Sequence, residues 1–136
     1  MKKVVIIDGQ GGRMGRALVE EIHKLCPGQP LLALGANTTA TAAMMKAGAA
    51  MGATGENPVL VACRDANIIA GPIGILMADA LMGEITPAMA VAVGQSPAKR
   101  ILVPVNHCDN YIVGVTDLSM AKLIEGVVTE VGKLIG

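Results

Sequence analysis

Three glycines near the amino terminus have the spacing of a phosphate-binding turn. Gly9, Gly12 and Gly15 stand three residues apart, directly after the β-branched run Val4–Asp8. Between a strand and a helix, the first glycine permits a positive φ angle. The second lets backbone N–H groups approach an anion, and the third lets the helix pack closely on its strand. Free N–H groups and the positive end of the helix dipole attract phosphate. The pattern therefore predicts an anion cradle made of exposed amide groups at residues 9 to 15.

Two neighbouring features bear on which nucleotide this turn would take. The carboxylate of Asp8 would lie close to a pyrophosphate, and like charges ~5 Å apart at an effective dielectric near 20 repel by about 3 kcal/mol. Arg13 could offset that repulsion, or Asp8 could face a metal, an amine or the turn's own N–H groups. The next expected strand ends at Gly35 and is followed by Asn37 and Thr38, without the acid that holds the ribose of NAD. We therefore expect a slight preference for NADP over NAD.

Further candidates come from the ends of other expected strands, because ligands of open parallel sheets lie outside the carboxyl ends of the strands. The predicted cofactor-binding residues are Asp8, Gly9, Gln10, Gly11, Gly12, Arg13, Met14, Gly15, Asn37, Thr38, Gly71, Gly74 and Asn106. His107 is the candidate for a catalytic acid or base, although a lone loop histidine is more often simply solvated. No set of three or four converging ligands predicts a metal site. Glu84 is as readily a surface charge as a functional one.

Apolar periodicity places these residues between alternating strands and helices. The expected strands are 4–8, 31–34, 51–54, 67–70, 100–105 and 111–115. The expected helices are 13–25, 38–47, a segment from Gly74 to about Met82, 86–94, and one that follows a Ser119 cap. Residues 56–65 fit a strand by their valines and a helix by their place in the alternation. The order predicts a single α/β domain over residues 1–136, with a Rossmann-like, doubly wound, mostly parallel sheet of five or six strands and helices on both faces.

Composition limits the possible partners. The 136 residues are 52% hydrophobic, with Tyr111 as the one aromatic, so the core must be aliphatic. Eleven basic and eleven acidic residues balance without a basic stripe, which argues against nucleic acid as a partner.

The remaining expectations concern location and assembly. Three scattered cysteines without CxxC pairing, no signal-peptide pattern and no span-length apolar run predict a cytoplasmic protein that is not bound to a membrane. A mean hydropathy of +0.55, with Met77, Met82 and Met89 on uncharged expected helices, predicts a homo-oligomer.

Two resemblances add to this interpretation. The run Gly11-Gly12-Arg13-Met14-Gly15-Arg16 resembles the nicotinamide-cofactor turn of dihydrodipicolinate reductases, over the first strand and helix only. The whole chain resembles a family of short bacterial proteins catalogued as a domain of unknown function. The segments that carry this second resemblance are 8–12, 53–57, 71–74, 83–90 and 104–106. It implies a Rossmann-like fold and supplies no activity.

Two hypotheses of function follow. The first is a nucleotide-binding protein, which as an enzyme would be an NAD(P)-linked oxidoreductase. It requires that the amide groups of residues 9 to 15 be free of internal acceptors, and that a Gly12→Asp substitution abolish binding without disturbing the fold. The second is a structural or regulatory oligomeric protein without a nucleotide, in which the glycines are architectural.

Overall fold

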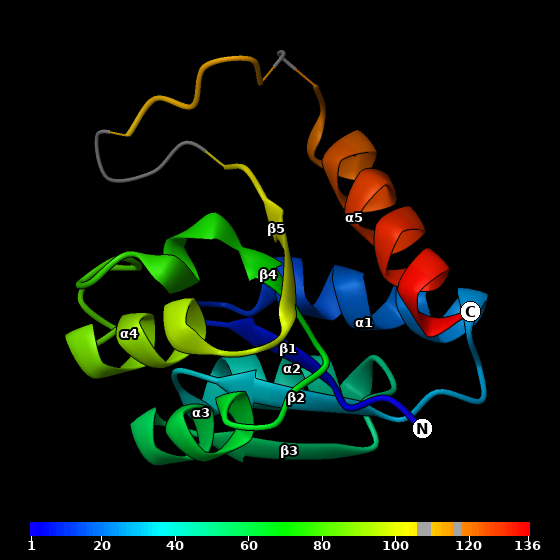
Figure 1. Ribbon diagram of the computed structural model, residues 1–136, viewed down its shortest axis with the longest axis horizontal. Helices are drawn as coiled ribbons and strands as arrows, with labels where there is room; N and C mark the ends of the chain where they lie inside the picture. Colours follow the sequence, from blue (N-terminus) through cyan, green and yellow to red (C-terminus); the bar gives the residue numbers. More distant parts are fainter. Residues whose placement is uncertain (106–109, 116–117) are drawn as a thin grey trace.

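Within residues 1–105, 110–115 and 118–136, which are the residues that the structure describes, five parallel strands form one sheet. The computed structural model gives their order as β3-β2-β1-β4-β5 (Figure 1). The strands are β1 (Val4–Asp8), β2 (Leu31–Gly35), β3 (Met51–Thr54), β4 (Ile68–Pro72) and β5 (Lys99–Val103). Strand order reverses at β1, since the chain first moves outward to β2 and β3 and then returns to the other side at β4. The predicted doubly wound α/β fold is confirmed.

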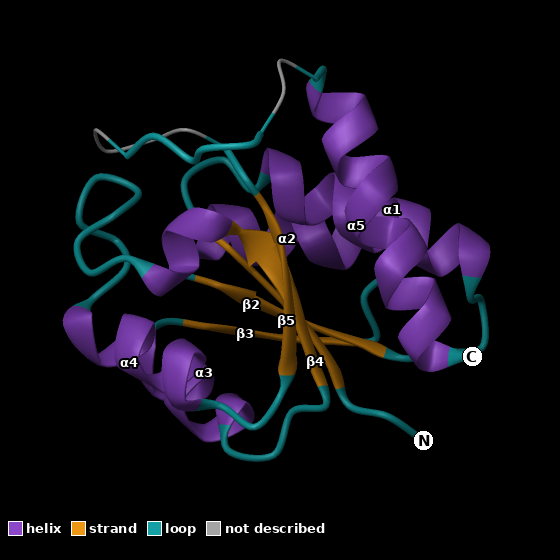
Figure 2. Ribbon diagram, turned by 45° about the horizontal axis from the view of Figure 1, so that its top comes forward, coloured by secondary structure: helices purple, strands orange, loops and turns teal. Residues whose placement is uncertain are grey.

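Helices cover both faces of this sheet (Figure 2). The helices α1 (Arg13–Leu25), α2 (Thr38–Lys46) and α5 (Met120–Ile135) lie on one face, and α3 (Glu56–Cys63) and α4 (Pro87–Gln95) lie on the other. Successive residues of β1 alternate between two cores: Ile6 packs with the first group of helices and Ile7 with the second. The aliphatic composition thus fills a core on each side of the sheet.

Side-chain caps fix where three helices begin. Asn37 Oδ1 accepts the N–H of Ala40 at 2.9 Å, so that Asn37 is the N-cap of α2. Thr86 caps α4 in the same way, with Pro87 at the first helical position. Ser119 caps α5 as predicted. Residues 56–65, for which a strand and a helix were both possible, form α3 over most of their length.

Two expected elements are wrong. The helix predicted up to Met82 is replaced by a short 3-10 helix, η1 (Ile73–Leu76), and by a tight loop that we call the 77–85 loop. Leu81 and Met82 have φ angles of 56° in this loop, which a right-handed helix cannot contain. The strand predicted at 111–115 does not form, and Val113 is 87% exposed, so its β-branched side chain has no core to pack against.

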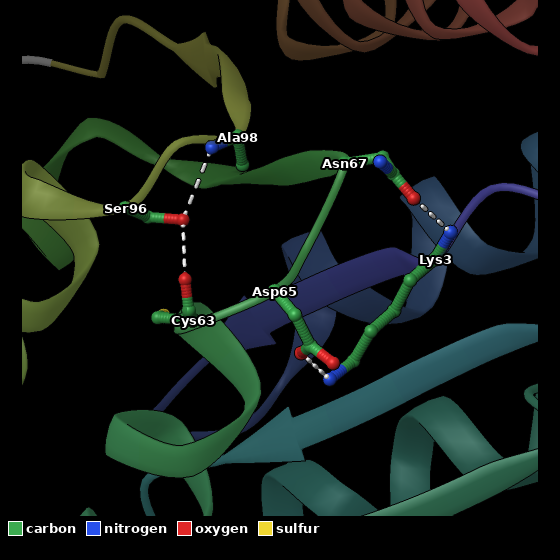
Figure 3. A network of polar contacts seen from close by, with 6 residues as sticks. All are labelled: Lys3, Cys63, Asp65, Asn67, Ser96 and Ala98. Carbon is green, nitrogen blue, oxygen red and sulfur yellow. Dashed lines mark hydrogen bonds and ion pairs between the residues drawn. The ribbon is translucent and has the colours of Figure 1, made fainter.

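The amino ends of the central strands are joined by side-chain bonds (Figure 3). The backbone N–H of Lys3 donates to Asn67 Oδ1 at 2.7 Å, and Lys3 Nζ pairs with Asp65. The hydroxyl of Ser96, which is buried, donates to the carbonyl of Cys63 at 2.6 Å and accepts the N–H of Ala98. These contacts join β1, β4 and β5 at their amino ends. The glycine turn follows β1 and therefore lies at the opposite, carboxyl edge.

In the part of the chain that the structure describes, no helix combines the length and the apolar character needed to cross a membrane.

Candidate functional site

The glycine turn lies at the carboxyl end of β1, where the strand order reverses. Open α/β sheets bind their ligands at such a point. A cavity of about 440 Å³ opens there, lined by residues 8–14 of the turn and by Pro72, Leu81 and Val105. Its walls therefore come from the ends of β1, β4 and β5, which are neighbours in the sheet, and from the 77–85 loop. The volume lies in the range of small-molecule sites.

Asp8 lies beneath this turn with 5% of its surface exposed. Its two carboxylate oxygens accept the N–H of Gly9 at 2.8 Å and the N–H of Gly15 at 2.7 Å. Burial raises the pKa of Asp8 above the ordinary 3.8, although the bonds from Gly15 and Gly9 act to lower it; the nearby Glu84 raises it further. Of the roles that the sequence left open for Asp8, the structure shows the one in which it faces the turn's own amides.

The expected cradle of free amides is wrong for most of the turn. Besides Gly9 and Gly15, Gln10 donates its N–H to Glu84 Oε1, and Gly12 donates to the carbonyl of Gly9 at 2.9 Å. Among the described residues, the backbone N–H groups of Gly11 and Arg13 donate to no acceptor. The backbone N–H of Met14 faces Asp8 and lowers its pKa. Any anion at this turn must therefore bind at the amides of Gly11 and Arg13.

Close packing explains most of the glycines of the turn. Gly12 has a φ of 71°, and a Cβ there would lie 2.7 Å from the Cα of Ala40 in α2. A Cβ on Gly15 would lie 2.6 Å from Met44 Sδ, and one on Gly9 would lie 2.6 Å from Glu84 Oε1. The expectation that Gly12→Asp leaves the fold intact is therefore wrong. At Gly11, by contrast, a Cβ would meet nothing within 4 Å.

Glu84, which the sequence left open between a surface charge and a functional residue, lies at the turn and comes from the 77–85 loop. Its Oε1 accepts the N–H of Gln10 at 2.5 Å, and its Oε2 accepts from Asn37 Nδ2 at 2.8 Å. Asn37 Nδ2 also donates to the carbonyl of Gln10 at 2.9 Å. Asn37 is thus committed to internal bonds, while Thr38 beside it is exposed. Glu84 lies in one of the segments that carry the family resemblance, which was the available signal.

The other predicted site residues divide between the cavity and the core. Arg13 is exposed and Met14 half-buried on the cavity wall. Gly71 is buried in β4, where a Cβ would collide with the carbonyl of Ile7, so it serves the packing of β4 on β1. Gly74 is buried in η1. The remaining two candidates, Asn106 and His107, lie outside the described residues.

The 77–85 loop contains left-handed residues that are not glycine. Met82 has a φ of 56° and is 92% exposed, so its side chain contributes little packing that could offset the backbone strain. We expect Met82→Gly to raise the free energy of unfolding by about 0.5–1 kcal/mol, because glycine adopts this region without a steric penalty. Denaturant unfolding measures the change.

A control for that substitution is Ala78→Gly, at an exposed residue of the same loop outside the left-handed region. It should lower the free energy of unfolding by about 0.5–1 kcal/mol, through backbone entropy alone. A loss of stability in both variants would contradict the assignment of strain to Met82.

No three His, Cys, Asp or Glu side chains gather as a metal-binding group within the described ranges. The sequence pattern of the family described as "Domain of unknown function (DUF3842)" matches residues 3–136. No curated protein and no solved structure matches the chain.

Proposed function

The chain belongs to the DUF3842 family, and from the geometry of its glycine turn we propose that it binds a phosphate-containing nucleotide such as NAD(P). The observation that carries the proposal is the cavity at the reversal of strand order, lined by the turn itself. Because internal acceptors occupy most of the amides that the sequence interpretation required to be free, the proposal now depends on two of them. A phosphate group would accept hydrogen bonds from the N–H groups of Gly11 and Arg13 at the amino end of α1. The exposed guanidinium of Arg13 supplies a compensating positive charge.

Asp8 restricts how that phosphate can bind. Its carboxylate already occupies the N–H groups of Gly9 and Gly15 on the buried side of the turn. A ligand phosphate therefore binds above the turn and does not replace Asp8. The proposal concerns a small-molecule ligand, with NAD(P)-linked redox chemistry as the reaction class if the protein is an enzyme.

Thermal denaturation against NAD(H), NADP(H), ATP, FAD and S-adenosylmethionine tests the proposal. A ligand at about 100 times its Kd adds ~2.7 kcal/mol of stability, which is a shift of several degrees in Tm for a chain of this size. Gly11→Asp should abolish that shift, because the new carboxylate would lie at the free amides. The fold should persist, since the position has open space and no positive φ.

The matched control is Gly28→Asp. Gly28 also has open space around it and no positive φ, and it lies in the connection between α1 and β2, away from the turn. This variant should keep the full ligand shift. An absence of any shift with the unchanged protein, or a shift that survives Gly11→Asp, would contradict binding at this turn.

The alternative proposal is a structural or regulatory oligomer without a nucleotide. It is favoured by the close contacts that account for Gly9, Gly12 and Gly15, and by the internal acceptors of the turn. Of the three methionines expected at an oligomer surface, Met82 is 92% exposed, whereas Met89 is buried in the core and Met77 is half-buried. Other large apolar side chains of the described residues are also exposed: Met1, Leu25, Met45, Met51, Val61, Val91, Tyr111, Val113, Leu118 and Met120. A stable oligomer by solution mass measurement, with no ligand shift, would support this alternative.

A further inference from the structure

We infer that Glu84 selects the sugar of the bound nucleotide: its carboxylate accepts the hydroxyls of an unphosphorylated ribose, so that the ligand is of the NAD class and not of the NADP class. The inference rests on the proposed function, because it names the ligand of the same turn. It is carried by the position of Glu84, by the acceptor sites that its carboxylate has left, and by the space that Gly9 gives it.

Glu84 lies beside the glycine turn, next to the residues that line the cavity, and it contacts Gln10 and Asn37. In dinucleotide-binding sheets an acid that follows the second strand holds the ribose hydroxyls. Here β2 ends at Gly35, and Asn37 stands where α2 begins. Glu84 reaches this point from 47 residues further along the chain, and its Oε2 lies 2.8 Å from Asn37 Nδ2. The carboxylate that β2 lacks is therefore provided by the 77–85 loop.

The carboxylate is held in place and still has acceptor sites. The N–H of Gln10 and the side chain of Asn37 each occupy one oxygen of Glu84. A carboxylate offers about four acceptor positions, so roughly two remain, one on each oxygen. The two vicinal hydroxyls of a ribose can donate one hydrogen bond to each of these oxygens.

Gly9 is what allows this approach. A Cβ at residue 9 would lie 2.6 Å from Glu84 Oε1. Gly9 has no positive φ, contrary to the role expected of the first glycine, so its missing side chain serves the carboxylate that lies against it. Its absent side chain places Glu84 beside the turn that would hold the phosphates, as a ribose next to a pyrophosphate requires.

The same carboxylate disfavours a phosphorylated ribose. A 2′-phosphate would bring a second anion against Glu84, and residues 35–39 contain no arginine or lysine to neutralise it. We expect NAD to bind at least about tenfold more tightly than NADP after solvent screening. This reverses the preference for NADP expected from the residues after β2 alone, because that expectation considered only neighbours in sequence.

Isothermal titration of NAD⁺ and NADP⁺ tests the inference, with the unchanged protein and with Glu84→Gln. In the unchanged protein NAD⁺ should bind at least about tenfold more tightly. In Glu84→Gln the affinity for NAD⁺ should fall about tenfold and the ratio should approach one, because the neutral amide accepts fewer hydroxyls and no longer repels phosphate. Glu56→Gln is the control: Glu56 is an exposed acid at the start of α3, bonded to Thr86, and its loss should leave the ratio unchanged.

The outcomes separate the inference from the proposed function. Binding of both dinucleotides with equal affinity, or a preference for NADP⁺, in the unchanged protein overturns the role of Glu84 while nucleotide binding stands. Tighter binding of both ligands by Glu84→Gln also overturns it, since Glu84 would then compete with the ligand. If the unchanged protein binds no nucleotide, the proposed function itself fails. If Glu84→Gln does not fold, the ratio of the affinities for NAD⁺ and NADP⁺ in the unchanged protein still tests the inference.

Discussion

Gly12→Ala is expected to lower the free energy of unfolding by about 3 kcal/mol. Two costs add at this residue. A left-handed conformation, with φ at 71°, costs an L-residue about 1–2 kcal/mol. The new Cβ would also lie 2.7 Å from the Cα of Ala40, so α1 and α2 would have to move apart, and overpacking of this kind costs about 1–3 kcal/mol. Denaturant unfolding followed by circular dichroism measures the loss.

Two further variants divide that cost between its causes. Gly11→Ala, next in the chain but with open space and no positive φ, should change stability by less than about 1 kcal/mol. Gly12→Asn keeps the collision but tolerates the left-handed region better, so it should recover part of the loss. If Gly12→Ala proved as stable as Gly11→Ala, the close approach of the two helices at this residue would be refuted.

Asp8→Asn is expected to lower the free energy of unfolding by about 2–3 kcal/mol at neutral pH. The carboxylate accepts the N–H of Gly9 and the N–H of Gly15 in a buried position. An asparagine has one acceptor oxygen, so its NH₂ group would face one of these two donors and leave it unsatisfied. Loss of the acceptor for a buried donor costs about 1–3 kcal/mol, and a bond to a charged group is stronger than a neutral one. Unfolding curves of the two proteins measure the difference.

The pH dependence of this difference has a definite sign. Burial raises the pKa of Asp8 in the folded protein above its unfolded value near 3.8. The folded state therefore holds the proton more tightly, and this contribution to stability is fully present below the unfolded pKa and is lost as pH rises through the folded pKa. The advantage of the unchanged protein over Asp8→Asn should consequently grow as pH is lowered from neutral toward 3.8. An advantage that shrinks over this interval would contradict the burial of the carboxylate.

For Asp65→Asn we expect a stability difference with the opposite dependence on pH. The hydrogen bond and the charge of Lys3 lower the pKa of the exposed Asp65. Its contribution is present above the unfolded pKa and is lost as pH falls through the lowered folded pKa. The pair lies at the amino edge of the sheet, so its removal should leave ligand binding at the turn unaffected (Figure 3).

The elements that the sequence predicted well are those with local signals at both ends. The helix at 13–25 has a glycine before it and Pro27 after it, and its bounds match those of α1. The helix predicted up to Met82 failed although its residues suit a helix. The side chain of Leu81 packs beside Gly9 and Gly74. Its backbone is left-handed, and no local sequence pattern predicts that conformation.

The candidate site was predictable in position but not in detail. Strand, glycines and helix locate the turn because they are contiguous in the chain. The hydrogen-bond acceptors of its amides are not all contiguous with it. Glu84 bonds to Gln10 from 74 residues away, and only the folded chain shows which acid reaches which donor. Asp8 belongs to the same segment, yet its burial and raised pKa could not be predicted. Both depend on how the fold removes it from water and places the amide of Gly15 against it.

The hydrogen bonds of Glu84 with Gln10 and Asn37 also affect hydrogen exchange at the carboxyl edge of the sheet. The amide of Gln10 and the side chain of Asn37 are both held by a residue of the 77–85 loop. A backbone hydrogen exchanges with solvent when its bond opens, so the Gln10 amide can exchange only when the Glu84 bond breaks. Left-handed Leu81 and Met82 lower the free energy needed to rearrange that loop. A motion that carries Glu84 away from the turn breaks this bond, so we expect the protection of the Gln10 amide to follow the motion of the 77–85 loop.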